Sequence, residues 1–225
     1  MSVSPFPRDE AAGTTENAIS VIVTTSLIPS APSTEVIGGT IKSLKLLGLD
    51  PRTKVLIAVE GLKLSHRNRR RELHRLHRYR EHLAIEFCEP NFGVRQAARH
   101  VHLSGLLRMT VQEVTTSHVL VVQHDMPFIR SFDVELLRIQ MAQNPVIKHL
   151  RFNLRNNLPS GQDLATTRRK GTEHIDRSHF FKELAQREGD SYPVIQTLNW
   201  SDNNYLCSTA YLKEAILPPL RGHAV

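Results

Sequence analysis

Short apolar runs rich in Val and Ile recur along the chain, and each ends in polar residues. Such runs are typical of strands that are buried on both faces of a sheet. The clearest three cover residues 18–23, 54–59 and 118–123. The third is followed by His124 and Asp125. A strand suited to a protein interior therefore leaves an imidazole and a carboxylate at its end.

Between and beyond these runs, apolar residues recur at intervals of three and four, which predicts amphipathic helices. Two such stripes cover residues 37–47 and 134–141. Ser, Thr and Asp side chains ahead of a helix can accept hydrogen bonds from its first free N–H groups. The candidate caps are Ser33 or Thr34 for the first helix and Ser131 or Asp133 for the second. The early chain thus predicts the order strand, helix, strand.

The remaining segments have a weaker pattern. A basic stretch at residues 63–82 keeps a thin helical stripe, and residues 84–88 are expected to form a third strand that ends at Glu89 and Pro90. Residues 91–93 predict the start of a helix that carries apolar side chains up to Val101. Later segments predict an edge strand, a long polar loop, another strand and a short helix. They cover residues 146–154, 156–179, 194–200 and 209–217, respectively.

Strands that alternate with helices in this order predict an α/β fold with a central, mostly parallel sheet and helices on both faces. The 225 residues suffice for one domain, which we expect to cover residues 18–225. Residues 1–17 contain Pro, Gly and acids without an apolar run, and are expected to form a flexible tail. In such sheets, ligands bind outside the carboxyl ends of the strands, where the polar ends of the runs meet.

The charge balance limits the kinds of partner without selecting one. The chain has 29 Lys and Arg against 22 Asp and Glu, a net charge of +7, which suits a polyanion or a small phosphorylated substrate. Its two cysteines, Cys88 and Cys207, match neither a disulfide scaffold nor a zinc module. No segment approaches the roughly 20 apolar residues of a spanning helix. We therefore expect a cytoplasmic or soluble protein without a transmembrane segment, with membrane association through a basic face left open.

The polar end of the third run suits a divalent cation. Carboxylate oxygens are ligands for Mg²⁺ and Mn²⁺, and imidazole also suits Mn²⁺. Asp125 is a single carboxylate, so water and substrate phosphates would have to supply the other ligands. The alternative is that Asp125 only caps a turn before Pro127 and that His124 is a surface residue. The sequence of residues 123–125 alone leaves both interpretations open.

Four segments follow one another along the chain, at residues 20–24, 57–61, 91–99 and 119–125. Their order resembles the landmarks of GT-A type glycosyltransferases, most closely small family-2-like transferases that include those of large algal viruses. In that family, two early strands embrace the nucleotide, a helix opened by Asn and Gly lies near it, and a DxD motif ends a later strand. The resemblance covers residues 18–154 and implies a single GT-A-like, Rossmann-related domain.

The resemblance also implies a metal-dependent transfer of a sugar from a nucleotide-sugar donor, a UDP-sugar, to a hydroxyl group of a carbohydrate or glycan acceptor, with inversion. The cofactor would be Mn²⁺ or Mg²⁺, and Asp125 matches the last acid of the DxD motif, which binds the metal. Gln123 replaces the first Asp of that motif, which leaves the contact of that position open. The positions that match the family's nucleotide-sugar site are Thr24, Thr25, Glu60, Asn91, Arg95, Gln123 and His124.

An inverting transferase also needs a general base for the acceptor hydroxyl, usually a carboxylate. Asp202 follows the last predicted strand, at about the place where the family has its base or acceptor-binding acid, and is the candidate catalytic residue. The alternative role for Asp202 is to cap a turn in an Asx-rich loop.

Residues 67–82 contain seven arginines and can bind an anionic surface, although a solvated helix face is the simpler interpretation. Tyr79 is the only aromatic residue among them, so they form no stacking platform and we expect no nucleic-acid partner. A second hypothesis follows from this segment. The chain would then be a non-catalytic GT-A-like binding module whose basic face binds a polyanion.

Overall fold

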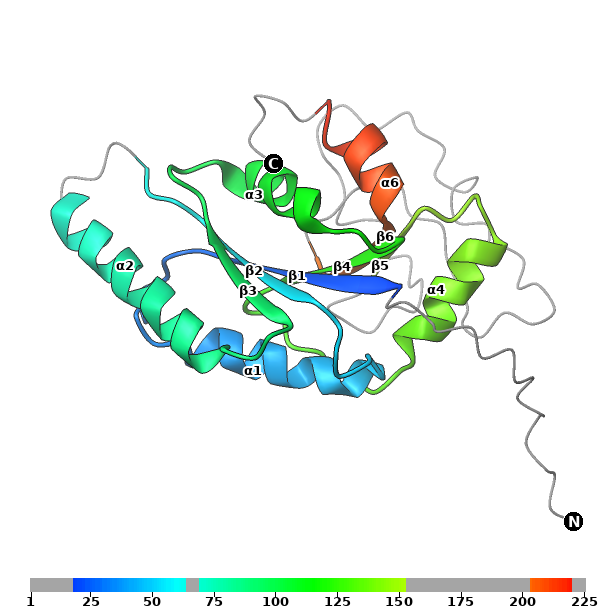
Figure 1. Cartoon of the computed structure of the whole chain (residues 1–225), viewed down its shortest axis with the longest axis horizontal. Helices are drawn as coiled ribbons and strands as arrows, with labels where there is room; N and C mark the ends of the chain where they lie inside the picture. Colours follow the sequence, from blue (N-terminus) through cyan, green and yellow to red (C-terminus); the bar gives the residue numbers. More distant parts are fainter. Residues whose placement is uncertain (1–17, 64–68, 153–202, 220–225) are drawn as a thin grey trace, which may run out of the picture.

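β1 (Ile19–Thr25) lies inside a sheet and pairs in parallel with a strand on each side (Figure 1). The computed structural model describes residues 18–63, 69–152 and 203–219, and within these ranges the sheet has six strands. The others are β2 (Val55–Val59), β3 (Phe92–Gln96), β4 (His118–Gln123), β5 (His149–Arg151) and β6 (Tyr205–Ser208). Their order is β3-β2-β1-β4-β6-β5. The first four strands in this order are parallel, and β6 is antiparallel to both of its neighbours. The predicted mostly parallel sheet is therefore confirmed.

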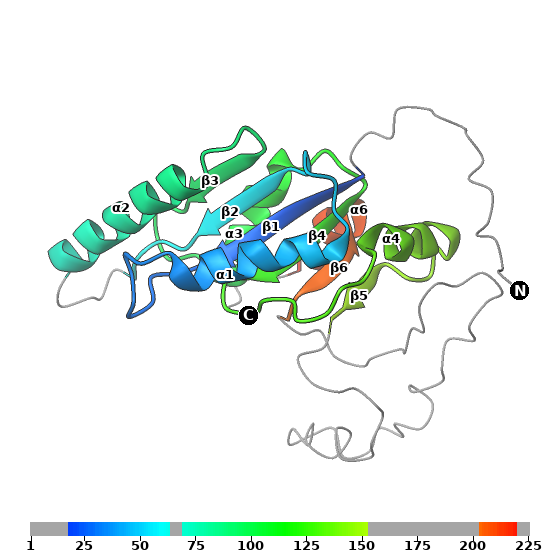
Figure 2. The same ribbon diagram turned by 90° about the horizontal axis from the view of Figure 1, so that it is seen from below.

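Helices cover both faces of this sheet. Within the described residues they are α1 (Glu35–Ser43), α2 (Arg69–Glu86), α3 (His102–Thr110), α4 (Val134–Gln143) and α6 (Thr209–Tyr211), with the short helical turns η1 (Leu44–Leu47), η2 (Val111–Glu113) and η4 (Leu212–Ile216). Figures 1 and 2 show α1, α2 and α4 on one face, and α3 and α6 on the other. The α/β class with helices on both faces is thus confirmed as well.

The two faces of the central strands contact different helices. Val21 and Val23 belong to the core that includes residues of α1, α2 and α4, whereas Ile22 belongs to the core beneath α3. Every residue of β1 and β2 is buried. A strand with no solvent-facing side is mostly apolar, and its few polar side chains need partners within the fold, which is why these runs stand out in the sequence.

Residues 84–88 do not form the predicted third strand, because α2 continues through Glu86. Leu76, Tyr79 and Leu83 form one fully buried stripe at helical spacing. Burial of this stripe against the sheet keeps the segment helical through its last turn.

The helix predicted to start at residues 91–93 is also wrong, because Phe92–Gln96 form β3. β3 pairs with β2 in the register Val55↔Phe92 and gives the backbone groups of β2 their partners. As an edge strand, β3 is only partly buried and so has no apolar run. The helix follows it as α3 and starts at His102.

Other predicted elements are present. The Asp133 carboxylate caps α4 and accepts hydrogen bonds from the backbone N–H groups of Glu135, at 2.9 Å, and Leu136, at 3.3 Å. The edge strand expected within residues 146–154 is β5, and the last predicted helix is α6 with η4. The predictions for residues 1–17, 156–179 and 194–200 lie outside the described residues.

The two cysteines lie in different environments. Cys88 is exposed, whereas Cys207 is fully buried in β6, and neither forms a disulfide. Burial raises the pKa of the Cys207 thiol to about 12, so Cys207 is a core residue and not a nucleophile. No helix in the described part of the chain is long and apolar enough to cross a membrane.

Arg75 attaches α2 to the loop between β1 and α1. Its Nη1 donates hydrogen bonds to both carboxylate oxygens of Glu72, at 3.0 and 3.1 Å. Its Nη2 donates, at 3.1 to 3.2 Å, to the carbonyl oxygens of Ile28, Pro29 and Ala31. Arg75 therefore has a structural role, although the sequence does not distinguish it from the other arginines of the basic segment.

Two more side chains of α2 support the same attachment. The hydroxyl groups of Tyr79 and Thr25 lie 2.8 Å apart, which connects α2 to the end of β1. Nδ1 of His82 lies 3.0 Å from the carbonyl oxygen of Pro32. The helix is thus held firmly beside the carboxyl end of the central strand.

Replacing Arg75 by Ala should lower the free energy of unfolding by about 1 to 3 kcal/mol, because three loop carbonyls and the Glu72 carboxylate lose charge-assisted hydrogen bonds. Arg78→Ala is the matched control, because Arg78 is exposed on the same helix, and it should change stability by less than about 0.5 kcal/mol. Urea unfolding followed by circular dichroism measures both. Equal losses in the two variants would contradict the structural role of Arg75.

Candidate functional site

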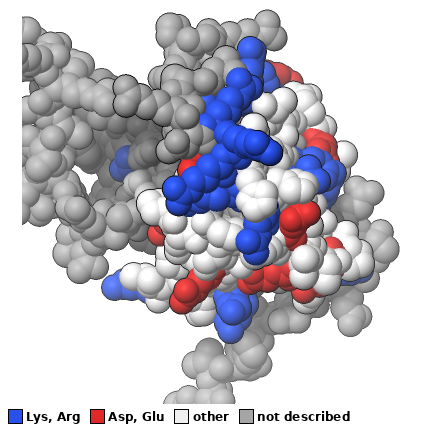
Figure 3. All heavy atoms as spheres, turned by 90° about the vertical axis from the view of Figure 1, so that its left-hand side faces the viewer, with Lys and Arg blue, Asp and Glu red and all other residues white. Residues whose placement is uncertain are grey.

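The carboxyl ends of β1, β2 and β4 lie at one edge of the sheet, at the left-hand end of the molecule in Figure 1. Figure 3 views this end directly and shows a band of Lys and Arg side chains across it. In the strand register, Thr24 lies beside Ala58 on one side and Gln123 on the other. Parallel pairing therefore brings together the polar ends of three separate apolar runs.

Thr24 and Thr25 form the floor of this edge. Both are buried, and their hydroxyl groups have partners within the fold. Thr24 Oγ1 donates to the carbonyl oxygen of Val122 at 3.4 Å, and Thr25 Oγ1 lies within hydrogen-bonding distance of Tyr79. These two threonines shape the edge, and their hydroxyls are already engaged.

Glu60 is also buried at this edge, and its carboxylate binds the chain that follows β3. Oε1 accepts hydrogen bonds from the backbone N–H groups of Gly61, at 3.0 Å, and Val101, at 2.8 Å. Oε2 lies 3.5 Å from Nδ1 of His100. The carboxylate thereby fixes the loop between β3 and α3 above the end of β2.

The close approach of this loop requires a glycine at position 61. A Cβ atom at Gly61 would lie 2.4 Å from the carbonyl group of Arg99, so no side chain fits there. His102, three residues after Arg99, has a φ of 58°, which is uncommon for a residue with a side chain. Backbone strain of this kind is concentrated at functional sites.

The half-buried His100 side chain pairs with the buried Glu60 carboxylate next to the strand ends. Burial lowers the pKa of His100, and the neighbouring Glu60 carboxylate opposes that shift. The His102 ring packs edge-on against the His100 ring, with centroids 4.1 Å apart. Nε2 of His100 is buried and has no hydrogen-bond partner among the described residues. A buried polar atom without a partner is uncommon in folded proteins, so this nitrogen is a candidate to hydrogen-bond a ligand at this loop.

Residues 123–126 form a turn after β4 that is held by other parts of the chain. The His124 N–H donates to the carbonyl oxygen of Thr24 at 3.0 Å, and the Thr40 hydroxyl of α1 donates to the carbonyl oxygen of His124 at 2.6 Å. The Met126 N–H donates to the carbonyl oxygen of Gln123 at 3.2 Å, which closes the turn. The backbone around Asp125 is therefore fixed from two sides.

Asn204, just before β6, holds the same turn from across the sheet edge. Its Oδ1 accepts from the N–H of Gln123 at 2.9 Å, and its Nδ2 donates to the carbonyl oxygen of Met126 at 2.7 Å. Asn204 is buried, so both bonds are shielded from water. The sequence shows Asn204 only as one member of an Asx-rich stretch, and its partners lie about 80 residues away in the chain.

Asp125 differs from the other acid at this edge, because its carboxylate is exposed and no described residue bonds to it. His124 beside it is half-buried. The described residues contain no cluster of three His, Cys, Asp or Glu side chains able to hold a metal by themselves. Asp125 and His124 therefore fit an ion of the Mg²⁺ or Mn²⁺ type that takes its remaining ligands from phosphates and water.

Two predicted binding residues do not join this site. Arg95 lies in β3, but its guanidinium turns away and pairs with Glu113, at 2.5 and 2.7 Å, and this hydrogen bond lowers the pKa of Glu113. The Asn91 amide donates to the carbonyl oxygens of Thr53 and Pro51, ahead of β2. Both therefore serve the opposite edge of the sheet, where they line a shallow depression of about 610 Å³. Asp202 lies outside the described residues.

No protein-family model matches the sequence, and no curated protein matches it either. These comparisons therefore give no support to the narrower resemblance to transferases of algal viruses.

Solved structures with a similar arrangement include two transferases and a synthetase. A mannosyltransferase from Pyrobaculum calidifontis, in complex with GDP-Man and Mn²⁺, is 13% identical with a TM-score of 0.41, and the match covers 63% of this chain and 37% of that one. TarS 1-349 of S. aureus, in complex with UDP-GlcNAc, is 16% identical with a TM-score of 0.42, and the match covers 87% and 46%. A CMP:2-keto-3-deoxy-manno-octonic acid synthetase complexed with CTP is 12% identical with a TM-score of 0.42, covering 87% and 76%.

The chain spans less than half the length of the mannosyltransferase and of TarS. At these identities and TM-scores, the similar structures assign the chain to no family. The structure of the chain itself is an α/β fold whose parallel strands leave polar side chains, one of them an exposed carboxylate, at a common edge.

Proposed function

We propose that this protein is a metal-dependent glycosyltransferase that moves a sugar from a UDP-sugar donor to a hydroxyl group of a carbohydrate or glycan acceptor, with inversion. The observation that carries the proposal is the exposed carboxylate of Asp125, which no described residue pairs, at the carboxyl edge of four parallel strands. α/β proteins bind nucleotides at such edges. The order of the landmark segments in the sequence supports the same reaction.

In this proposal, Asp125 binds Mn²⁺ or Mg²⁺ with His124 beside it, and the donor phosphates complete the ligand set. When bound, the cation acts as a Lewis acid for the negative charge that develops on the leaving diphosphate. The fixed backbone of residues 123–126 supports this role, because a rigid ligand loses less entropy on binding.

The nucleoside part of the donor would lie over the ends of β1 and β2. Thr24, Thr25 and Glu60 are buried there with their polar groups engaged, so we assign them to the floor and wall of the donor site. Gln123 is half-buried at the same edge and is assigned to the wall beside Asp125. Asn91 and Arg95 are left out of the proposed site because their side chains serve the opposite edge.

The proposed chemical step is a single displacement at C1 of the sugar. The acceptor oxygen forms a bond to C1 while the bond from C1 to the diphosphate oxygen breaks, and the electron pair of that bond leaves with UDP. The hydroxyl proton passes to the Asp202 carboxylate. Asp202 is assigned this role because it follows the last strand expected from the sequence, at about the place where the resemblance puts the base.

Asp125→Ala should abolish the dependence of UDP affinity on Mn²⁺ and weaken UDP binding at saturating Mn²⁺ by about tenfold or more, because the protein loses its carboxylate ligand. Calorimetric titration with UDP, with and without Mn²⁺ and after chelation, measures this. Asp50→Ala is the matched control, because Asp50 is paired with Arg52 at the opposite edge of the sheet. UDP binding that is indifferent both to Mn²⁺ and to Asp125→Ala would refute the metal role.

Asn204→Ala should lower Mn²⁺-dependent UDP affinity about tenfold while the protein remains folded, because the 123–126 turn loses two buried hydrogen bonds. Ser117→Ala removes a side-chain hydrogen bond to the carbonyl oxygen of Ala18 at the other end of β4 and serves as the control. Titration by calorimetry, with thermal unfolding in parallel, separates affinity from stability. If both variants bind UDP like the unmodified protein, Asn204 does not position the turn.

Asp202→Asn should reduce transfer to an acceptor about 100-fold or more and leave UDP affinity unchanged, because the amide cannot take the acceptor proton. A screen of nucleotide sugars that detects hydrolysis identifies the donor first, and transfer to glycan acceptors is then measured with it. Transfer by Asp202→Asn at the unmodified rate would exclude Asp202 as the base.

A further inference from the structure

The outer side of α2 carries a set of arginines that the proposed transferase reaction does not use. Five of them are exposed and make no hydrogen bond or ion pair with any described residue: Arg69, Arg70, Arg71, Arg78 and Arg80. The three acids of the helix make no hydrogen bond or ion pair with these five arginines. Glu72 pairs with Arg75, Glu81 lies 3.1 Å from His77, and Glu86 ends the helix beside Gly38 of α1. The helix therefore presents a concentrated positive charge to its surroundings.

This charge is arranged unfavourably for the isolated helix. Arg69, Arg70 and Arg71 occupy the first turn of α2, where the positive end of the helix dipole disfavours cations. Neighbouring guanidinium groups also repel one another. An anionic surface opposite the helix would relieve both effects, and the inward hydrogen bonds of Arg75 would hold the helix in place beneath it.

Two large apolar side chains lie among these arginines. Ile85 is 73% exposed and Leu73 is 48% exposed. Residues seven apart lie on nearly the same side of a helix, so Arg71, Arg78 and Ile85 form one row. By the same spacing, Leu73 and Arg80 form a second row, which lies about 160–200° around the helix from the first, so one flat surface cannot contact both rows. Each row thus combines arginine with an apolar side chain that has no partner in the described core.

The position of α2 leaves this side accessible. Figures 1 and 2 show α2 at the periphery of the molecule, with no other described element outside it. Its 18 residues make a rod of about 27 Å, long enough to lie flat along a surface. We refer to Arg70, Arg71, Arg78 and Ile85, which lie on the side of the helix away from the buried stripe of Leu76, Tyr79 and Leu83, as the outer face of α2.

We propose that the outer face of α2 docks on an anionic lipid bilayer, with the arginines at the lipid phosphates and carboxylates and with Ile85 inserted at the boundary of the acyl chains. Charge complementarity selects an anionic partner, and the exposed Ile85 side chain selects a bilayer over a soluble polyanion, which offers it nothing to insert into. The carboxyl edge of the sheet lies at the same end of the molecule as the start of α2 (Figure 1), so docking would bring that edge close to the lipid surface. The docking itself requires no donor, metal or acceptor.

The test is flotation of the full chain with vesicles of phosphatidylcholine containing about 30% phosphatidylserine, and with vesicles of phosphatidylcholine alone. The full chain should bind the anionic vesicles and release them as ionic strength rises. The triple variant Arg70→Gln, Arg71→Gln, Arg78→Gln should lower the partition coefficient about 100-fold, since each arginine near an anionic leaflet contributes about fivefold.

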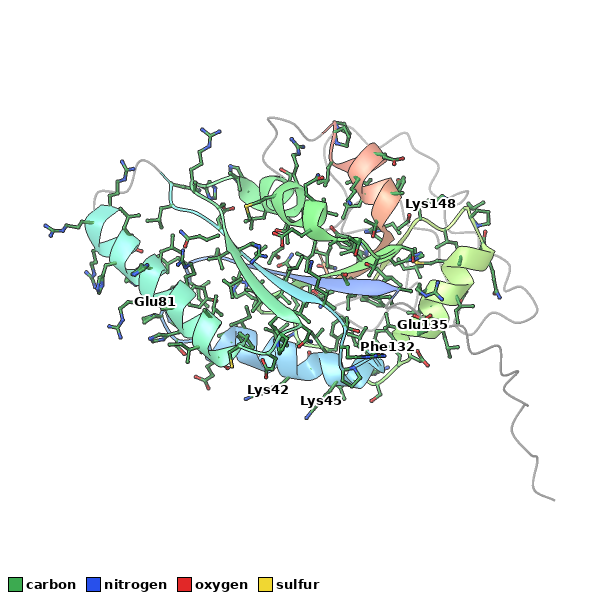
Figure 4. The ribbon with its side chains drawn as sticks, viewed as in Figure 1. Lys42, Lys45, Glu81, Phe132, Glu135 and Lys148 are labelled. Atoms are coloured by element: carbon green, nitrogen blue, oxygen red, sulfur yellow. The ribbon has the colours of Figure 1, made fainter. Side chains whose placement is uncertain are left out.

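The matched control removes the same charge from elsewhere. Lys42, Lys45 and Lys148 are exposed, and Figure 4 shows them on α1, on η1 and ahead of β5, respectively, so none of them belongs to α2. The triple variant of these lysines to Gln should change the partition coefficient by less than about threefold, because only long-range attraction is lost. Equal losses in the two triple variants would overturn the proposal, because net charge and not the outer face of α2 would then account for binding.

A second pair of substitutions distinguishes a bilayer from other polyanions. Leu73→Ser, on the other flank of the helix, is the control and should leave vesicle binding unchanged. Ile85→Ser keeps every charge and should weaken binding to anionic vesicles about tenfold, while binding to heparin is unchanged. Vesicle binding that this variant leaves intact would overturn insertion and with it the choice of a bilayer. Binding of heparin through the same arginines with no binding to anionic vesicles would also overturn the proposal. Because no nucleotide sugar is present, either result leaves the test of the transferase reaction unaffected.

Discussion

β1 pairs in parallel with β2 on one side and β4 on the other, and this pairing brings the candidate site together. The chain returns to the same edge of the sheet after each buried run, so residues about 100 positions apart become neighbours, as Thr24 and Gln123 do. Backbone hydrogen bonds within the sheet fix that register, and burial of both faces prevents the strands from slipping. The composition of the candidate site at this edge depends on that register.

The two acids at this edge have different environments and so different roles. Glu60 is buried and binds two backbone N–H groups and His100, so its charge is used to hold a loop. Asp125 is exposed on a turn that Thr40 and Asn204 hold from either side. A carboxylate that is fixed in position but unpaired by the described residues can bind a ligand, whereas one satisfied by its own chain stabilises the fold. The same side-chain type thus has two functions within one edge.

α2 shows a similar division among its arginines. Arg75 faces inward and saturates the carbonyl oxygens of the preceding loop, whereas the arginines on the outer face have no described partner. In the sequence, all of them belong to one basic stretch with a solvated face as its simplest interpretation. The structure separates an internal support from a surface that carries charge and an apolar side chain together.

The sequence by itself determined the central strands, because a strand buried on both faces carries a run of apolar residues that is visible without any knowledge of its neighbours. It also determined α4, whose cap and apolar stripe are local features. It did not determine β3, because an edge strand is only partly buried and its pairing with β2 is a long-range interaction. The sequence did not predict the end of α2 either. Residues 84–88 alone resemble a short strand, but packing of Leu83 against the sheet keeps the chain helical through Glu86.

For the candidate site, the sequence supplied the chemistry and the tertiary structure supplied the partners. Polar residues at the ends of apolar runs are a local signal, so Thr24, Glu60 and Asp125 could be selected without coordinates. The orientation of Arg95 toward Glu113 and the bonds of Asn204 to residues 123–126 could not, because these partners are 18 and about 80 positions away. Which polar atoms are already satisfied is decided only when distant segments pack together, and that decision separates the groups that hold the fold from those that remain available to a ligand.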